Sequence, residues 1–276
     1  MNFFFSPCPN DTFMFDAMVH QKIDTEGLSF AVRMADIEVL NHAAFNEEAA
    51  ITKLSYHAAA LVAGKYKILP SGSALGYGNG PLLVSRDAIS PSTLADVPVA
   101  IPGKYTTAAL LLKMAFPQVN HLHEMVFSDI ETAVLNGTMA AGTLIHEGRF
   151  TYAAKGLRLI ADLGQCWEQR TAQPVPLGCM AVSRKLDGAT QQKIARVVRR
   201  SVEFALNNPQ ESAAFVAQHA QEINPRVTGQ HIQLYVTDFS LDLGDRGRTA
   251  VAQFFAEALK IGVIDQLPED LFVTVN

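Results

Sequence analysis

The chain has 276 residues, 49% of them hydrophobic, which is enough for a large core and favours two lobes over one. Its 22 basic and 27 acidic residues give a net charge of −5 and form no long runs, which argues against nucleic acid as a partner because phosphate binding needs a clustered basic face. The first residues lack the basic start and apolar core of a secretory signal, and no apolar run approaches the ~20 residues of a membrane span. We therefore expect a cytoplasmic protein with no membrane partner.

The cysteines fit the same compartment. Cys8, Cys166 and Cys179 lie far apart in the sequence, and no Cys-x-x-Cys pair is present. An odd number of unclustered cysteines suits a reducing compartment with free thiols. Cys8 follows a proline just after an expected strand, where a nucleophile could sit, but nothing distinguishes it from a small packed side chain.

Strand and helix patterns alternate through the first part of the chain. Short apolar runs bounded by turn residues indicate strands, and a following Asn, Asp or Ser indicates the start of a helix. The expected strands are residues 2–5, 28–34 and 51–54, and the helices that follow them begin at Asn10, Asp36 and Ser55. This βαβαβ order predicts a parallel sheet with right-handed crossovers.

The most glycine-dense segment, Ser71–Pro81, does not match a nucleotide-binding loop. Its spacing is not G-x-G-x-x-G, no Gly-Lys-Ser/Thr follows, and the segment leads into a strand. Both phosphate-loop mechanisms need the N-terminus of a helix at that point. The glycines either let the backbone approach a ligand closely or form a mobile loop, and the sequence does not separate these two interpretations.

A second series of elements follows a boundary at Ser90-Pro-Ser-Thr. The spacing of Ser128 and Glu131 is that of a capping box, and Gly137 is placed to end the same helix. From Asp187 onward nearly all of the chain has a helical pattern. The expected strands between these points are residues 97–101, 122–127, 143–145 and 157–163, and the expected helices begin near Lys104 and Ser128, with another around Trp167.

These elements predict an α/β protein of two lobes, each a mixed, mainly parallel sheet flanked by helices. Residues 1–87 and 177–276 form a discontinuous outer lobe, and residues 88–176 form an inserted lobe. Two strands, 82–85 and 179–183, are expected to cross between the lobes. A clamp of this plan would hold its ligand in the cleft and exclude water on closing.

His146 is the leading catalytic candidate. The apolar run Thr143–Ile145 reads as a buried strand that stops at His146, and the carboxyl end of a strand in an open α/β sheet faces the ligand crevice. An imidazole can give or take a proton near neutral pH, so His146 could be a general base, or it could cap the strand through a backbone carbonyl. Glu147 and Arg149 either orient the site or pair with each other, and Phe150 stands where a His-Glu-x-x-His motif would need its second histidine.

Hydroxyl and amide side chains mark three strand-to-helix junctions. At each junction the free N–H groups and the helix dipole favour an oxygen-rich group, although ordinary N-capping would explain each one singly. Together with His146 they would form a polar ring around one crevice. The residues at the junctions are Ser6 with Asn10, Ser55, and Thr106 with Thr107, and Asn41 lies on the flank of the neighbouring helix.

Two further motifs each have two interpretations. Lys53 lies in an apolar strand just before Ser55, where it could bind a substrate carboxylate or extend its ammonium to the surface with its stem packed. Its position favours binding slightly, through the backbone more than through the ammonium. His121 and His123 share one face of a strand, but no third ligand is evident, so an exposed strand is the better interpretation than a metal site.

Five motifs in order along nearly the whole chain resemble the 1,4-dihydroxy-6-naphthoate synthase family of the futalosine route to menaquinone. The resemblance implies a fold like the periplasmic binding proteins of the second type. It also implies a small-molecule substrate, cyclic dehypoxanthine futalosine, with no metal or organic cofactor, and it leaves open a monomer or a homodimer. The motifs are Ser6-Pro-Cys-Pro-Asn-Asp-Thr-Phe, Thr52-Lys-Leu-Ser-Tyr, Ser73-Ala-Leu-Gly with Gly80-Pro81, Pro102-Gly-Lys-Tyr-Thr-Thr-Ala, and Ile145-His-Glu-Gly-Arg-Phe-Thr-Tyr.

The resemblance also implies roles for individual residues. The family's proposed proton acceptor, the histidine of the Ile-His-Glu motif, corresponds to His146. Proton removal from a sugar hydroxyl would drive cleavage of a carbon–carbon bond and aromatisation of the remaining ring. The family's substrate-contacting motifs correspond to Lys53, Leu54, Ser55, Thr106 and Thr107, to which the crevice argument adds Asn10 and Asn41.

Two alternative functions stay open at this point. Chorismate dehydratase shares the pathway and the fold, but its opening typically resembles Tyr-Leu-Asn rather than the Ser-Pro-Cys-Pro found at Ser6. A non-catalytic solute-binding protein would share the clamp. The absence of an export signal counts against this function, and so does the presence of a histidine directed into the cleft.

Overall fold

A computed structural model describes residues 1–221 and 224–275, and the chain divides into two compact units. The first unit comprises Met1–Gly76 and Pro176–Asn276, and the second comprises Tyr77–Val175. The strand at 82–85, expected to cross between lobes, pairs only with strands of the second unit in the described chain. The chain therefore passes from the first unit to the second before residue 87, where the boundary was expected. No helix in the described ranges combines the length and apolar character needed to traverse a bilayer.

The sheet of the first unit has the strand order β2-β1-β3-β11-β4, with β5 paired to β11. β1 runs parallel to both β2 and β3, as the βαβαβ pattern predicts, whereas β11 runs antiparallel to β3 and β4. The carboxyl ends of β1, β2 and β3 therefore share one edge of the sheet. The bounds are β1 Asn2–Phe5, β2 Ala31–Met34, β3 Ile51–Ser55, β4 Tyr66–Ile68, β5 Ala74–Gly76 and β11 Val175–Ser183.

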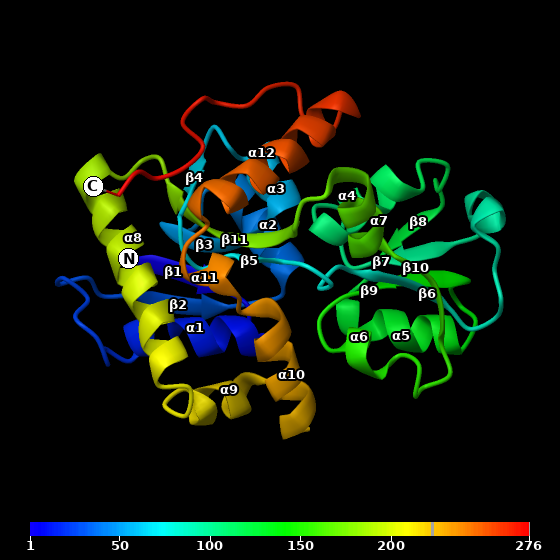
Figure 1. The fold of residues 1–276 in the computed structure, drawn as a ribbon, viewed down its shortest axis with the longest axis horizontal. Helices are drawn as coiled ribbons and strands as arrows, with labels where there is room; N and C mark the ends of the chain where they lie inside the picture. The colour runs from blue at the N-terminus through cyan, green and yellow to red at the C-terminus, as the bar shows by residue number, and fades with distance from the viewer. Residues whose placement is uncertain (222–223, 276) are drawn as a thin grey trace. The chain divides into compact units, whose positions relative to one another are not determined.

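Helix α1 packs between this sheet and α8, and the three elements share one core (Figure 1). Phe3 of β1 meets Phe15 of α1 edge to face, with ring centroids 5.5 Å apart. The stripe on α8 that includes Val198 is buried, and the Ser201 hydroxyl donates to the Met14 carbonyl at 2.7 Å. The helices of this unit are α1 Pro9–Val19, α2 Ile37–Phe45, α3 Tyr56–Leu61, α8 Gly188–Asn207, α9 Ala213–His219, α10 Pro225–Tyr235, α11 Asp238–Leu241 and α12 Gly244–Lys260.

The sheet of the second unit has the order β10-β6-β9-β7-β8. β7 is parallel to β8 and β9, and β6 is antiparallel to β9 and β10. The carboxyl ends of β7, β8 and β9 therefore lie at the same edge as the amino end of β6, where Leu82 lies opposite Leu144. The bounds are β6 Leu82–Ser85, β7 Val99–Ile101, β8 Leu122–Glu124, β9 Ala141–Leu144 and β10 Arg158–Asp162.

Helices cover both faces of this second sheet (Figure 1). α4 and α7 pack together on one face, and α5 packs against β9 and β7 on the other. The contact with α5 needs a glycine, because a Cβ at Gly142 would lie 2.5 Å from Ile130 Cγ2 and 2.9 Å from Val134 Cγ2. The bounds are α4 Thr107–Ala115, α5 Phe127–Leu135, α6 Gly148–Thr151 and α7 Leu163–Thr171, with a short 3-10 turn η1 at Pro91–Asp96.

Two helix starts differ from the sequence prediction. The capping box at Ser128 is wrong, because α5 begins at Phe127 with Val126 as its N-cap, which places Ser128 inside the first turn. Helix α1 begins at Pro9 rather than after a cap at Asn10, since proline needs no amide partner in a first turn. The side chain of Asn10 is thereby freed from capping for other contacts.

The end of the glycine-rich segment, from Tyr77 onward, packs tightly against the backbone of the second unit. A Cβ on Gly80 would lie 2.3 Å from Gly164 Cα, and one on Gly164 would lie 2.7 Å from Gly80 Cα. The Gly78 amide donates to Glu168 Oε1 at 2.7 Å. The glycine at position 80 is therefore needed for the approach of two backbones.

We expect Gly80→Ala to lower the free energy of unfolding by about 1–3 kcal/mol, because the added methyl group must displace the start of α7. Gly188→Ala is the matched control, since a Cβ there meets nothing within 4 Å. Urea unfolding of both variants measures the difference. Equal stability of the two variants would contradict the close contact.

Candidate active site

Asp11 is the centre of a buried polar cluster at the carboxyl edge of the first sheet. Its Oδ2 accepts from the Ser6 hydroxyl at 2.8 Å and from the Ser6 amide at 3.2 Å. Its Oδ1 accepts from Asn10 Nδ2 at 2.9 Å and from Lys53 Nζ at 2.6 Å. Asp11 is 0% exposed, so these donors replace the water that a carboxylate needs.

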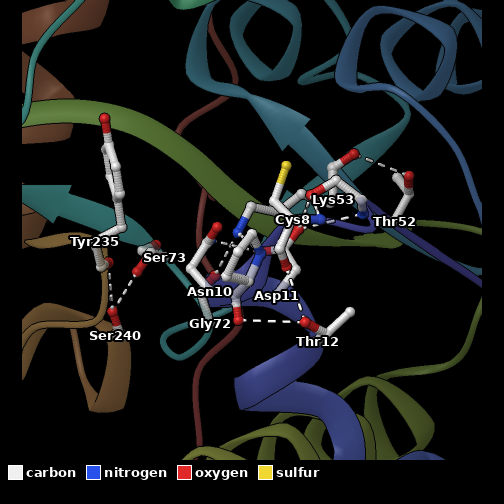
Figure 2. A network of polar contacts seen from close by, with 12 residues as sticks. Cys8, Asn10, Asp11, Thr12, Thr52, Lys53, Gly72, Ser73, Tyr235 and Ser240 are labelled. Atoms are coloured by element: carbon white, nitrogen blue, oxygen red, sulfur yellow. Dashed lines mark hydrogen bonds and ion pairs between the residues drawn. The ribbon is translucent and has the colours of Figure 1, made fainter. Parts of the chain in front are cut away.

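Lys53 points inward to this carboxylate rather than to the surface, as Figure 2 shows. Its side chain is 5% exposed, and its ammonium also donates to the Gly72 carbonyl at 3.2 Å. The surface interpretation of Lys53 is therefore wrong. The ammonium joins β3 to the first turn of α1 and to the segment before β5, which gives Lys53 a structural role beside any role in substrate binding.

Asn10 connects the same cluster to the C-terminal part of the chain. Its Oδ1 lies 2.9 Å from Nε2 of His231, a fully buried histidine on α10 whose ring also lies 4.5 Å from that of Tyr235. Asn10 thus spans from His231 to Asp11. Sequence reasoning missed His231, because its partner is far away in the chain and a lone helical histidine has no local signature.

Ser55 and Asn41 form a second polar contact at the same sheet edge. The Ser55 amide donates to Asn41 Oδ1 at 3.0 Å, and Asn41 Nδ2 donates to the Ser55 hydroxyl at 3.2 Å. Ser55 is the N-cap residue of α3, but its side chain makes no capping hydrogen bond. N-capping therefore does not explain Ser55, whereas a buried polar pair with Asn41 does. Leu54 is fully buried in the core.

A buried thiol lies behind this edge. Cys179 of β11 lies opposite Leu54, and burial raises the pKa of its thiol from 9.0 to about 12, although the charge of Lys53 acts in the opposite direction. None of the three cysteines is part of a disulfide. Cys179 is consequently a protonated, unreactive side chain at neutral pH.

In the second unit Thr106 and Thr107 begin α4, directly after β7. Thr106 is an N-cap residue, whose hydroxyl accepts from the Ala109 amide at 3.2 Å and donates to the Gly103 carbonyl at 2.8 Å. Both threonines are buried. Among the three junctions, Thr106 is the one where the capping interpretation holds.

His146 lies at the carboxyl end of β9, the neighbour of β7, and therefore at the same edge as Thr106 and Thr107. Its φ of 54° lies in the left-handed region, which residues with a side chain adopt uncommonly and histidine more often than most. The ring is half-buried and lies 4.8 Å from that of Phe127, the first residue of α5. His146 and both threonines therefore follow neighbouring parallel strands, at the same edge of the sheet.

The turn after His146 is held by Arg149 of α6. Arg149 Nη1 donates to the Gly80 carbonyl at 2.5 Å, and Nη2 pairs with Asp162 Oδ2 at 2.6 Å. Asp162 Oδ1 accepts from the Gln165 amide at the start of α7. These partners favour the orienting interpretation of Arg149, and sequence reasoning did not anticipate Asp162.

The possible histidine pair is not part of either cluster. His121 directly precedes β8 and His123 lies on it, and both residues are exposed. The residues that the structure describes contain no group of three or more His, Cys, Asp or Glu side chains placed to hold a metal ion.

Comparison with known proteins places this chain in a family. Residues 2–260 match a family model described as menaquinone biosynthesis. A 1,4-dihydroxy-6-naphthoate synthase from Thermus thermophilus is 42% identical over 269 residues, covering 98% of this chain and 97% of that protein. The chain belongs to the 1,4-dihydroxy-6-naphthoate synthase family. A relative of the same name from Streptomyces coelicolor is 38% identical over 271 residues, covering 96% of this chain and 95% of that protein. The family consists of lyases of menaquinone biosynthesis, which confirms the resemblance drawn from the motifs.

Solved structures confirm the predicted fold class. A crystal structure of a protein from Archaeoglobus fulgidus is similar with a TM-score of 0.90 at 37% identity, covering 95% of this chain and 98% of that chain. The periplasmic aliphatic sulphonate binding protein of Escherichia coli is similar with a TM-score of 0.67 at 12% identity, covering 100% and 92%. At that identity the likeness concerns the fold alone, and it is a periplasmic-binding-protein-like fold.

We expect Lys53→Met to lower the free energy of unfolding by about 3–5 kcal/mol, because it leaves the buried Asp11 carboxylate without its counter-charge. The double variant Lys53→Met/Asp11→Asn removes both charges and should recover part of the loss. Lys67→Met, which breaks a pair with the exposed Asp270, is the control. Urea unfolding compares them, and a Lys53→Met loss no larger than the control's would contradict the buried pair.

The raised pKa of Cys179 predicts a stability that falls in alkali. The unfolded thiol ionises above pH 9.0, whereas the folded thiol stays protonated until about pH 12, so stability is intact below 9.0 and is lost as the pH rises to 12. The slope from one such group is about 1.4 kcal/mol per pH unit. Measured by urea unfolding between about pH 8.5 and 10.5, the free energy of unfolding should fall less steeply with pH in Cys179→Ala than in the unmodified protein. Other groups that ionise in this range contribute equally to both proteins and cancel in the comparison. Identical slopes would contradict the assignment.

Proposed function

We propose that the chain converts cyclic dehypoxanthine futalosine to 1,4-dihydroxy-6-naphthoate, with His146 as the proton acceptor. The relatives named for this product support the reaction. The observation that carries the role of His146 is its position at the carboxyl end of β9, at the same sheet edge as Thr106 and Thr107. A half-buried imidazole at that edge can meet a ligand and exchange a proton with it.

The proposed reaction needs one base and a scaffold of polar contacts. Neutral His146 takes the proton of a sugar hydroxyl, and the alkoxide becomes a carbonyl as the neighbouring carbon–carbon bond breaks. The electron pair of that bond passes to the ring, which aromatises and takes a proton back from His146, and the sugar-derived fragment leaves as the carbonyl compound. Thr107, at the first turn of α4, lies where N–H groups and the helix dipole favour substrate oxygens.

Within the proposal, the residues of the first unit divide into two kinds. Ser55 and Asn41 form a buried polar pair whose hydroxyl and amide groups are suited to substrate oxygens. Lys53 and Asn10 already bind Asp11, so we assign them the role of holding this edge in shape. Leu54 would contribute through its backbone, since its side chain lies in the core.

The proposed setting is the cytoplasm. None of Cys8, Cys166 and Cys179 is part of a disulfide, which suits a reducing compartment. The substrate is the small-molecule partner that the proposal requires.

We expect His146→Ala to lower turnover by about 10²-fold or more while folding and substrate binding stay largely intact, because the proton acceptor is lost. Mass spectrometry of the naphthoate formed from cyclic dehypoxanthine futalosine measures turnover. His123→Ala, at an exposed position on β8, is the control and should retain full turnover.

Other results would overturn the proposal in distinct ways. Near-normal turnover of His146→Ala would remove the histidine from its role. Binding of the substrate by the unmodified protein without any product would indicate a solute-binding protein instead. Dehydration of chorismate would indicate the sister enzyme of the pathway.

A further inference from the structure

The backbone at His146 needs support from its surroundings. A left-handed conformation is unfavourable for a residue with a side chain, so it persists where neighbouring contacts fix it. The following helix, α6, spans only Gly148–Thr151, and so short a helix is not stable by itself in water. The Arg149 amide reaches the His146 carbonyl at 3.4 Å, a long hydrogen bond. The Phe150 amide also donates to the Glu147 carbonyl at 2.9 Å, so contacts made by side chains supplement a short backbone turn.

Arg149 supplies those contacts to two separate segments. One arm of the guanidinium donates to the Gly80 carbonyl at 2.5 Å, and the other pairs with Asp162 at 2.6 Å. The side chains of Arg149 and Asp162 are 17% and 8% exposed, so solvent screens this pair far less than a surface pair. Each acceptor is itself fixed, because Gly80 packs on Gly164 and Asp162 caps α7.

The geometry suits arginine rather than lysine. A planar guanidinium presents N–H groups in a rigid fork, whereas an ammonium is a single compact charge on a flexible stem. The carbonyl of Gly80 and the carboxylate of Asp162 are bound by different nitrogens, Nη1 and Nη2. A lysine at this position would engage the two acceptors from one nitrogen and would hold the turn less firmly.

We propose that Arg149 is a positioning residue that fixes the His146 turn by clamping α6 to Gly80 and Asp162. The clamp connects the turn after β9 to the segment before β6 and to the end of β10, so the imidazole keeps one orientation at the sheet edge. The catalytic consequence rests on the proposed function of His146, whereas the effect on the ring is independent of it.

Two measurements test the clamp in the full chain. NMR of histidine-labelled protein reports the ring signals of His146, which are assigned by their loss in His146→Ala. We expect Arg149→Ala and Arg149→Lys to shift or broaden these signals and to lower kcat about 10–100-fold, since a displacement of about 1 Å can cost 10²-fold, with a much smaller change in KM. Lys155→Ala, which breaks a pair with Glu131 in the same unit, should change neither.

Rescue separates positioning from general damage. Guanidinium ion added to Arg149→Ala can occupy the space between Gly80 and Asp162, and it should restore part of kcat and of the ring signal. It should have no such effect on His146→Ala. If Arg149→Ala does not fold, Asp162→Asn removes the charge of the partner at nearly constant volume and should show the same shift of the ring with a smaller loss of kcat.

The outcomes distinguish this inference from the proposed function. Unchanged ring signals and unchanged kcat in Arg149→Ala and Asp162→Asn would overturn the clamp, as would a kcat loss without any change in the ring. If the His146 ring signals shift in Arg149→Ala but His146→Ala retains near-normal turnover, the clamp is supported and the catalytic role of His146 is overturned.

Discussion

A buried ion pair, Lys53 with Asp11, is the interaction on which the polar edge of the first unit depends. Removing two charges from water costs several kcal/mol for each ion, and the attraction offsets this cost only where hydrogen bonds satisfy the remaining atoms. Ser6 and Asn10 donate such bonds to Asp11, and the Gly72 carbonyl accepts one from Lys53. Because the members come from β3, the first turn of α1 and the segment before β5, one cluster sets the relative position of three segments.

The second unit also has an ion pair near its polar edge. Its edge carries the proposed proton acceptor on a short turn, and Arg149 of the helix that follows this turn pairs with Asp162, the last residue of β10. In both units a cation is bound by the protein's own carboxylate. The polar groups proposed to meet substrate oxygens, Ser55, Asn41 and Thr107, then carry no charge. Neutral groups suit a reaction in which one proton moves to one base.

Local sequence patterns predicted much of the fold and part of the candidate site. The strand at Ile51, the left-handed glycine after α5 and the place of His146 follow from runs of apolar residues and the residues that end them. The side-chain partners did not follow, because they join distant segments. Asn10 meets His231 across most of the chain, and a capping motif at Ser128 was overridden by a helix that starts earlier.

The discontinuous first unit has a consequence for synthesis. β3 is paired on one side by β1 early in the chain, but its other neighbour, β11, ends only at Ser183. All five strands of the second unit lie between Leu82 and Asp162. As the chain leaves the ribosome, the second unit can fold while β3 still presents an open edge of unpaired N–H and C=O groups. The edge of β3 that β11 covers in the folded chain therefore stays unpaired until translation has passed Ser183.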